Sequence, residues 1–333
     1  MQPADHVPLG KTRLTVTRLG LGTVPLAGLY DPVTDEDALD VIRRAYDMGL
    51  RLIDTAPLYG FGRAETLVGR VLAPLPRENI VLATKVGGLV QADISPNPQP
   101  SMFKGVRPLN TIRDFSYDGA MRSVHESLQR LGLDRIDILH IHDPDLHYGE
   151  ALSGAYRALD KLRGEGMIGA VGVGMNQAEM LARFAREGDF DCFLVAGRYT
   201  LLDQVALQEL LPLCVEKRIA VIIGGVYNSG ILADPRDGAP FNYAPANPEW
   251  IERARRLQAV CTRYNVPLKA AAIQFPMGHP AVVTVLAGAR SVAELEDNAQ
   301  MFSWKIPSDL WQELRAEGLL AENALVPAPG GPL

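Results

Sequence analysis

Cysteine is scarce in this sequence, which has three in 333 residues, all far apart along the chain. An odd number of cysteines at such spacing makes neither a zinc knuckle nor a disulfide framework. The sequence therefore favours the reducing cytoplasm as its compartment. We expect buried structural thiols at Cys192, Cys214 and Cys261.

An excess of positive charge and long apolar runs are missing as well. The 33 Lys and Arg residues are outnumbered by 39 Asp and Glu, for a formal net charge of −6. This balance argues against nucleic acid or an anionic membrane as a partner. No stretch reaches the roughly 18 unbroken apolar residues that a membrane helix needs, and Met1 to Gly10 carries no apolar signal segment. We expect a small-molecule partner, and the sequence leaves the oligomeric state open.

Short apolar runs alternate with longer amphipathic stretches along most of the chain. The predicted strands are 19–23, 51–54, 80–84, 136–142, 170–174, 192–196, 220–223 and 282–286. The predicted helices are 35–48, 64–72, 118–131, 151–165, 178–186, 204–217, 249–275 and 292–301. Strands that connect through helices are parallel and covered on both faces. Eight such units predict an α/β fold, a closed (β/α)8 TIM barrel, with an open doubly wound sheet as the alternative.

Additions to the barrel are predicted at both ends of the chain. A Gly10-Lys11 turn within Val7 to Val16 indicates a β-hairpin that plugs one barrel end, and Ser308 to Leu319 indicates an extra helix capped by Ser308. We expect one domain over 1–326 and a disordered tail over 327–333. The long connections Gly87 to Tyr117 and Gly225 to Pro248 follow strand ends, which favours a role as substrate walls or lids.

Polar side chains stand at the ends of three consecutive predicted strands. Asp54 ends the second strand with Tyr59 five residues on, Lys85 ends the third, and His142 ends the fourth. Hydride transfer at a carbonyl carbon needs a group that moves the proton of the oxygen. A free tyrosine has a pKa of about 10, and a nearby ammonium lowers that pKa by stabilising the phenolate. A carboxylate orients the lysine, and a neutral histidine positions the carbonyl oxygen.

Over essentially its whole length the chain resembles the aldo-keto reductase family. The motifs that carry the resemblance stand in the family's order: RLGLGT, LIDTAPLYG, LATKVG, ILHIHDPD and GARSVAELEDN. The set of Asp54, Tyr59, Lys85 and His142 matches the family's catalytic tetrad. The resemblance implies that Tyr59 is the acid in reduction and the base in oxidation. It also implies that Lys85 and Asp54 tune Tyr59 and that His142 orients the carbonyl.

Each of these residues also has an ordinary structural interpretation, and His140 adds a metal alternative. Asp54 alone is a common turn residue, Tyr59 a common rim aromatic and Lys85 a common solvated charge. His140 and His142 form a His-x-His on one strand face, as in metal-dependent barrel hydrolases. Further ligands from later strands are not evident, so we expect no metal and interpret His140 as a barrel-interior residue.

The segment after the eighth predicted strand resembles the family's cofactor segment. Backbone N–H groups at the start of its helix favour an anion such as the phosphate of a dinucleotide. Gly288 stands where many members have lysine, and Glu294 where they have arginine or glutamine. A carboxylate there favours NAD over NADP, although Ser291 and Glu294 also form a capping box and Arg290 offers a phosphate clamp. The candidate contacts are Gly288, Arg290, Ser291, Glu294 and Asn298.

Other candidate cofactor contacts come from the ends of other strands. Asn176 lies within one residue of the position at which the family binds the nicotinamide carboxamide. Gly224 stands near the site of an aromatic residue that often stacks on the nicotinamide, and Tyr227 is close by. The full set outside the cofactor segment is Gly22, Thr23, Asp54, Asn176, Gly224 and Tyr227.

Within the family, the chain resembles the branch of L-fucose and D-threo-aldose 1-dehydrogenases and of pyridoxal 4-dehydrogenases. The resemblance implies NAD(P)-dependent oxidation of an aldose or of a pyridoxal hemiacetal to a lactone, with Tyr59 as the base. The candidate pocket residues are Tyr30, Leu58 and Phe61. A general aldehyde or ketone reductase stays open, and so does a non-enzymatic accessory subunit of a potassium channel, because the fold alone does not prove function.

Overall fold

Eight parallel strands close into a barrel in the computed structural model, which describes residues 1–91, 102–106 and 109–328. They are β3 (Leu19–Gly22), β4 (Leu52–Asp54), β5 (Val81–Val86), β8 (Ile138–His142), β9 (Ala170–Met175), β10 (Cys192–Ala196), β11 (Ala220–Gly224) and β14 (Val282–Gly288). Each strand pairs in parallel with the strands before and after it, and β14 pairs with β3 to close the ring. The predicted (β/α)8 barrel is confirmed, and the open-sheet alternative is excluded.

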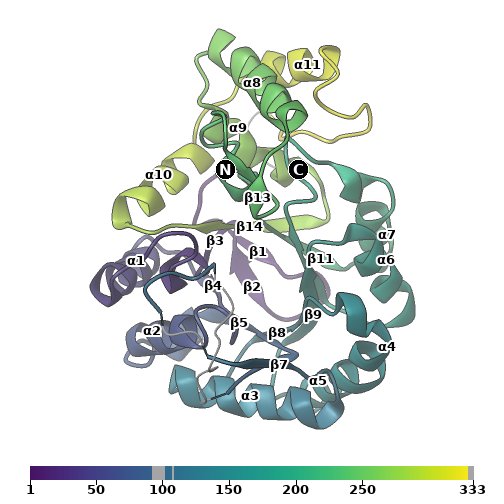
Figure 1. The fold of residues 1–333 in the computed structure, drawn as a ribbon. Helices are drawn as coiled ribbons and strands as arrows, with labels where there is room; N and C mark the ends of the chain where they lie inside the picture. The colour runs from purple at the N-terminus through teal and green to yellow at the C-terminus, as the bar shows by residue number, and fades with distance from the viewer. Residues whose placement is uncertain (92–101, 107–108, 329–333) are drawn as a thin grey trace.

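Helices surround the barrel (Figure 1). They are α1 (Asp35–Asp47), α2 (Arg63–Leu72), α3 (Tyr117–Leu131), α4 (Tyr148–Glu150), α5 (Tyr156–Gly164), α6 (Ala178–Glu187), α7 (Leu210–Lys217), α8 (Pro248–Arg263), α9 (Leu268–Gln274), α10 (Val292–Phe302) and α11 (Ser308–Ala316). Most of the buried apolar side chains lie between these helices and the strands. A second, smaller apolar cluster fills the barrel interior.

Three predicted helices differ from those observed. The helix predicted over 151–165 begins earlier and contains a π turn at Ala151–Ala155, because the Ala155 amide donates to Phe115 O (2.7 Å). The helix predicted over 204–217 is a 3-10 turn followed by α7. The region 249–275 divides into α8 and α9, because Asn265 is left-handed (φ +54°) and Pro267 follows.

The predicted cap of the last helix is wrong. Pro307 occupies the N-cap position, and no side chain caps the helix there. The hydroxyl of Ser308 instead donates to the carboxylate of Asp309 over 3.2 Å. Ser308 is already the first helical residue, so its side chain lies beside the first turn and not before it.

The predicted amino-terminal hairpin consists of β1 (His6–Pro8) and β2 (Thr15–Thr17). Its turn lies under the barrel: Leu9 is fully buried and belongs to the apolar cluster of the interior. A Cβ on Gly10 would come within 3.0 Å of Arg218 O and 3.2 Å of Asp191 O, next to the beginnings of β10 and β11. The hairpin therefore closes the end at which the strands begin, and leaves the other end for the chemistry.

Both long connections carry short hairpins at the end where the strands finish. In the first, β6 (Gly88–Val90) pairs with β7 (Thr111–Arg113), and in the second β12 (Pro240–Phe241) pairs with β13 (Ala244–Pro245). The four prolines at 96, 98, 100 and 108 lie outside the described residues. The role of these connections as lids stays a prediction.

The remaining expectations concern the tail, the thiols and the membrane. Positions 329–333 of the tail predicted to be disordered lie outside the described residues. The three cysteines are free and buried, as expected. Over the described ranges, no helix is long and apolar enough to cross a membrane.

Candidate active site

Asp54 and Lys85 form a buried ion pair at the ends of β4 and β5. The ammonium of Lys85 donates to Asp54 Oδ1 over 2.7 Å and to the carbonyl oxygen of Thr55 over 2.8 Å. The two side chains are 1% and 4% exposed, so the pair is shielded from solvent. Neighbouring parallel strands finish at the same end of the barrel, which is why residues 31 positions apart meet here.

Tyr59 and His142 complete the group. The Nζ atom of Lys85 lies 4.6 Å from the centre of the Tyr59 ring. That ring meets the imidazole of His142 edge to face, with 5.7 Å between the ring centres. Tyr59 is held by the tight turn that leads into α2, in which Gly60 and Gly62 have positive φ and Ala64 N donates to Tyr59 O. The structure therefore brings the four predicted side chains together.

Burial sets the protonation states of the site. It lowers the pKa of His142 well below the usual value, helped by the charges of Lys85 and Arg113, so the imidazole is neutral as expected. The expected depression of the Tyr59 pKa is not found. Burial raises the pKa of Tyr59 well above the ordinary value, and the negative charge of Asp54 acts in the same direction. The reason is that burial disfavours the charged phenolate and that the charge of Lys85 is balanced by its partner Asp54.

Several buried polar atoms of the site have no hydrogen-bond partner among the described residues. They are Asp54 Oδ2, Thr55 Oγ1, His142 Nδ1 and both ring nitrogens of His140. Buried polar atoms are nearly always paired in folded proteins, so unpaired ones are typical of a place that a ligand or ordered water completes. His140 is fully buried within the barrel, as predicted, and burial lowers its pKa to about 3. Within the described part of the chain, no three His, Cys, Asp or Glu residues are arranged to hold a metal ion.

The cofactor segment forms a bonded cluster at the beginning of α10. Ser291 Oγ caps the helix by accepting from Glu294 N over 3.2 Å. The carboxylate of Glu294 accepts from Arg290 N (2.8 Å) and from the Arg290 guanidinium (3.0 Å). Arg290 also contacts the carboxylate of Asp31 over 2.5 Å. The predicted capping box is thus modified, since Glu294 reaches the residue before the cap. Glu294 favours NAD and Arg290 offers a clamp for the phosphate of NADP, and these two side chains pair with each other.

Asn298 joins two other candidate cofactor contacts. Its Nδ2 atom donates to Gly288 O over 3.1 Å, and its Oδ1 atom accepts from the hydroxyl of Tyr227 over 3.0 Å. Gly288 itself is exposed, and a Cβ there would come within 2.6 Å of Pro25 Cγ. A helix N-terminus with an adjacent bare glycine backbone suits a dinucleotide phosphate, because backbone N–H groups there lack intrahelical partners.

The remaining cofactor candidates have different surroundings. A Cβ on Gly22 would meet no atom closer than 3.8 Å, so this glycine borders open space, and one on Gly224 would come within 3.3 Å of Leu194 Cδ2. Thr23 is fully buried and its hydroxyl donates to Asp54 O over 3.0 Å, so its side chain positions β4 and is not available to a ligand. Asn176 hydrogen-bonds the hydroxyl of Tyr243.

The three pocket candidates lie on the segments around the barrel mouth. Tyr30 is 37% exposed, adopts a left-handed backbone (φ +67°) and hydrogen-bonds Ser229. Leu58 packs against Gly88 of β6, since a Cβ on Gly88 would come within 2.7 Å of Leu58 Cγ. The ring of Phe61 contacts that of Phe103, with 6.2 Å between their centres. Their role as pocket walls stays a prediction.

Three further residues at this mouth were missed. Asp143 follows His142 directly, and its Oδ2 atom lies 3.5 Å from His142 Nε2. Arg113 of β7 donates to His142 O over 3.0 Å. Tyr243, between β12 and β13, contributes to the raised pKa of Tyr59. The motif HDPD contained a signal for Asp143, whereas Arg113 and Tyr243 come from the long connections and had none.

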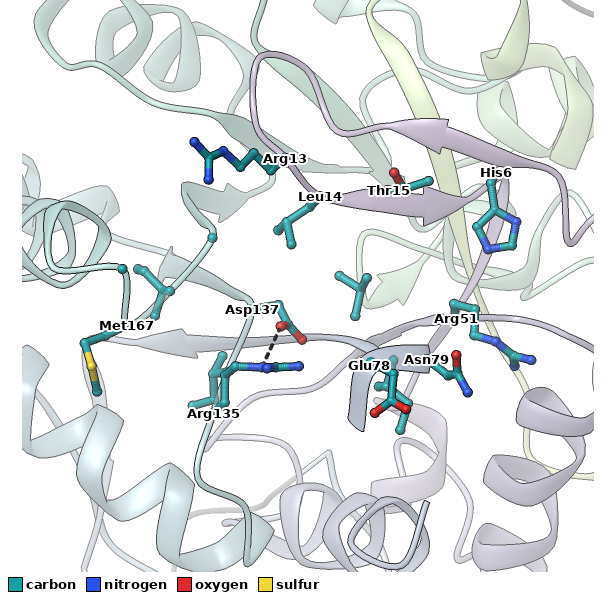
Figure 2. Close-up of a pocket in the computed structure, with 16 residues that line it drawn as sticks. His6, Arg13, Leu14, Thr15, Arg51, Glu78, Asn79, Arg135, Asp137 and Met167 are labelled. Carbon is teal, nitrogen blue, oxygen red and sulfur yellow. Dashed lines mark ion pairs between the residues drawn. The ribbon is translucent and has the colours of Figure 1, made fainter. Parts of the chain in front are cut away.

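A cavity of about 510 Å³ lies at the opposite end of the barrel (Figure 2). Its walls are the amino-terminal hairpin and the segments that precede β5 and β8, such as 78–81 and 135–137. Arg135 and Asp137 pair there over 3.4 Å. This cavity is separate from the group of Asp54, Tyr59, Lys85 and His142, because the strands begin on this side and finish on the other.

Comparison with known proteins identifies the class. The profile of the Aldo/keto reductase family matches residues 18–317. The chain is 44% identical to a pyridoxal 4-dehydrogenase of Microbacterium luteolum, over 96% of this chain and 99% of that protein. It is 39% identical to a D-threo-aldose 1-dehydrogenase of a Pseudomonas species, over 95% and 96%. The solved structure of a glycerol dehydrogenase from Gluconobacter oxydans shares the fold, with a TM-score of 0.73, 22% identity and 99% coverage of both chains.

A (β/α)8 barrel with this polar group at the strand ends is an oxidoreductase of the NAD(P)-dependent class. The chain belongs to the aldo-keto reductase family, whose enzymes use NAD(P)H. Its two relatives named above belong to the branch that the sequence motifs predicted.

Proposed function

We propose that this protein oxidises the anomeric hydroxyl of an aldose, or the hemiacetal of a pyridoxal-like compound, to a lactone. The observation that carries the proposal is the group of Asp54, Lys85, Tyr59 and His142, with its unpaired polar atoms, at the open end of the barrel. The names of the two curated relatives support the substrate class.

In the proposed reaction the anomeric C–H bond loses a hydride and the anomeric O–H bond loses a proton, so that a lactone carbonyl forms. When bound, an oxidised nicotinamide would supply the hydride acceptor. Tyr59 takes the proton through its phenolic oxygen, and neutral His142 holds the reacting oxygen in place. Lys85, fixed by Asp54, holds its ammonium beside the Tyr59 ring and partly offsets the burial that disfavours the phenolate.

The raised pKa of Tyr59 makes the rates of oxidation and of reduction depend on pH in opposite directions. A phenol is the form that donates a proton in reduction, and a phenolate is the form that accepts one in oxidation. Because burial raises the pKa of Tyr59, we expect kcat/KM for oxidation to increase from pH 7 to pH 10. Initial rates measured across this range in both directions test the expectation. An oxidation rate that falls toward alkaline pH contradicts it.

The residues at the beginning of α10 fit the phosphate and ribose of NAD. Arg290 is paired with both Asp31 and Glu294, so one positive charge meets two negative charges. This local excess of negative charge repels the 2′-phosphate of NADP, and a carboxylate accepts hydrogen bonds from a free 2′-hydroxyl. We therefore extend the proposal to NAD as the preferred cofactor.

Glu294→Gln is expected to raise kcat/KM with NADP+ relative to NAD+ by roughly 2- to 5-fold, since the side chain is partly exposed and its charge is partly screened. Steady-state rates with each cofactor at one saturating substrate concentration measure the ratio. Glu296→Gln is the matched control, because this carboxylate lies on the same helix and pairs with Arg44 instead. An unchanged cofactor ratio in Glu294→Gln removes the basis for the NAD preference.

The first experiment follows absorbance at 340 nm with NAD+ and with NADP+ against L-fucose, D-arabinose, L-galactose, pyridoxal and a simple secondary alcohol. Turnover of an aldose or of pyridoxal with a lactone as product supports the proposal. Reduction of carbonyl compounds without oxidation of any of these substrates overturns it. That outcome favours the second candidate, a general aldehyde or ketone reductase, for which the protonated Tyr59 phenol is the suitable acid.

The proposal also includes the setting of the enzyme. The three buried free cysteines favour the reducing cytoplasm. Residues 1–326 are proposed to form one domain, because the hairpin packs into the apolar cluster inside the barrel and α11 into the cluster that surrounds it.

A further inference from the structure

Asp143 places a second carboxyl group beside the catalytic histidine. It follows the last residue of β8 and adopts a left-handed backbone (φ +45°), with its amide donating to Gly174 O over 3.0 Å. In this conformation its Oδ2 atom lies 3.5 Å from His142 Nε2. The side chain is 39% exposed, whereas that of His142 is 11% exposed. The carboxyl group therefore faces both the imidazole and the open mouth of the barrel.

No protein donor within the described residues forms a hydrogen bond to this carboxyl group, apart from the His142 contact at 3.5 Å. Arg113, whose charge acts on this carboxyl group, donates to the backbone oxygen of His142 instead. Among the described residues, Asp143 Oδ1 has no partner, so the carboxyl group keeps an acceptor for a ligand beside the imidazole. Left-handed backbone at a non-glycine residue is uncommon and gathers at functional sites.

We propose that Asp143 recognises the substrate by accepting a hydrogen bond from the hydroxyl on the carbon next to the reacting part of the molecule. The inference rests on the proposed function and gives it a substrate class: compounds with a hydroxyl beside the oxidised position. In a sugar, neighbouring hydroxyl oxygens are separated by about one hydrogen-bond length. A reacting oxygen at Tyr59 and His142 therefore brings the next hydroxyl to Asp143.

The charge state of Asp143 decides how well it accepts. Burial raises its pKa to about 6, with Asp145 adding to the rise and Arg113 and Lys85 opposing it. The titratable and charged groups that face it are Arg113 of β7, Lys85 of β5, His142 of β8, Asp145 of the following turn, Tyr59 and Tyr243. Above pH 6 the ionised carboxylate accepts from the hydroxyl, and below pH 6 the protonated acid accepts poorly.

The test compares two sugars that differ in one hydroxyl. D-Arabinose carries the hydroxyl on its second carbon, and 2-deoxy-D-ribose is the same sugar without it. We expect wild type to prefer D-arabinose in kcat/KM, and Asp143→Asn to lose roughly 10- to 100-fold with D-arabinose but little with 2-deoxy-D-ribose. Asparagine tolerates the left-handed backbone and keeps the shape of the side chain, so folding is preserved. Pyridoxal and 3-deoxypyridoxal form a second pair, and the pair that shows the preference identifies the source of the hydroxyl.

Oxidation of either sugar depends on the ionisation of Tyr59 in the same way. The ratio of the rates with D-arabinose and 2-deoxy-D-ribose therefore reports on Asp143 alone. In wild type the preference for D-arabinose should fall as the pH drops through about 6, and in Asp143→Asn it should be small at every pH. Asp145→Asn is the control. It removes a neighbouring negative charge that raises the pKa of Asp143, so the preference should be intact at pH 8 and should persist to a lower pH than in wild type.

Equal losses with both members of a pair in Asp143→Asn overturn the inference, because they indicate a residue that only positions His142. A wild-type enzyme that oxidises both members equally well also overturns it, and in either case the proposed oxidation stands. Binding of each compound to the protein saturated with NAD+ is measured in parallel by calorimetry. If the protein neither oxidises nor binds any compound of the two pairs, the inference and the proposed function are both overturned.

Discussion

Tyr59→Phe is expected to lower kcat by roughly 10²- to 10⁴-fold, which is the usual contribution of a positioned proton carrier. The substitution removes the phenolic oxygen and keeps the ring, so the contacts with Lys85 and His142 are retained. The affinity for NAD+ and the melting temperature should change little. Stopped-flow or steady-state absorbance at 340 nm measures the rate, and calorimetry measures the cofactor affinity.

Tyr156→Phe is the matched control for this substitution. The hydroxyl of Tyr156 accepts from Asp189 N on the outer layer of the barrel, away from the strand ends that carry the catalytic group. Its rate should equal that of wild type. A Tyr59→Phe enzyme that retains more than about a tenth of the activity would show that Tyr59 is not the proton carrier.

Lys85→Met is expected to cost about 3–5 kcal/mol of folding free energy as well as the activity, because it leaves the buried carboxylate of Asp54 without its partner. Burial already raises the pKa of Asp54, and loss of the ammonium raises it further. The folded state then binds a proton more tightly than the unfolded state does. The variant should therefore be more stable at pH 5.5 than at pH 8. Urea unfolding at the two pH values measures this difference.

The double variant Lys85→Met/Asp54→Asn separates stability from catalysis. Removing both charges leaves no buried ion without a partner, so most of the lost stability should return. The rate should stay low, because the ammonium beside the Tyr59 ring is still missing. Recovery of activity together with stability would mean that Lys85 acts only through the fold. If Lys85→Met alone is as stable as wild type, the expected loss of folding free energy is contradicted.

The barrel and the polar group at its strand ends could be predicted because both depend on local pattern. Continuous apolar runs marked the strands, and a polar residue at the end of each of three consecutive strands marked Asp54, Lys85 and His142. Closure into a barrel places consecutive strand ends side by side, so order along the chain became proximity in space. The errors arose where a long-range contact overrode a local pattern, as when Phe115 O captured the Ala155 amide and formed the π turn.

The sequence by itself determined the barrel, the family and the four residues that meet at the strand ends, since these follow from periodicity and from motifs in order. Only the tertiary structure decided the protonation and the pairing. The depth of burial reversed the expected direction of the Tyr59 pKa, and packing joined Arg290 to Asp31, 259 positions away. Desolvation and long-range ion pairs depend on how segments pack in space, and that packing is not written in the spacing of residues along the chain.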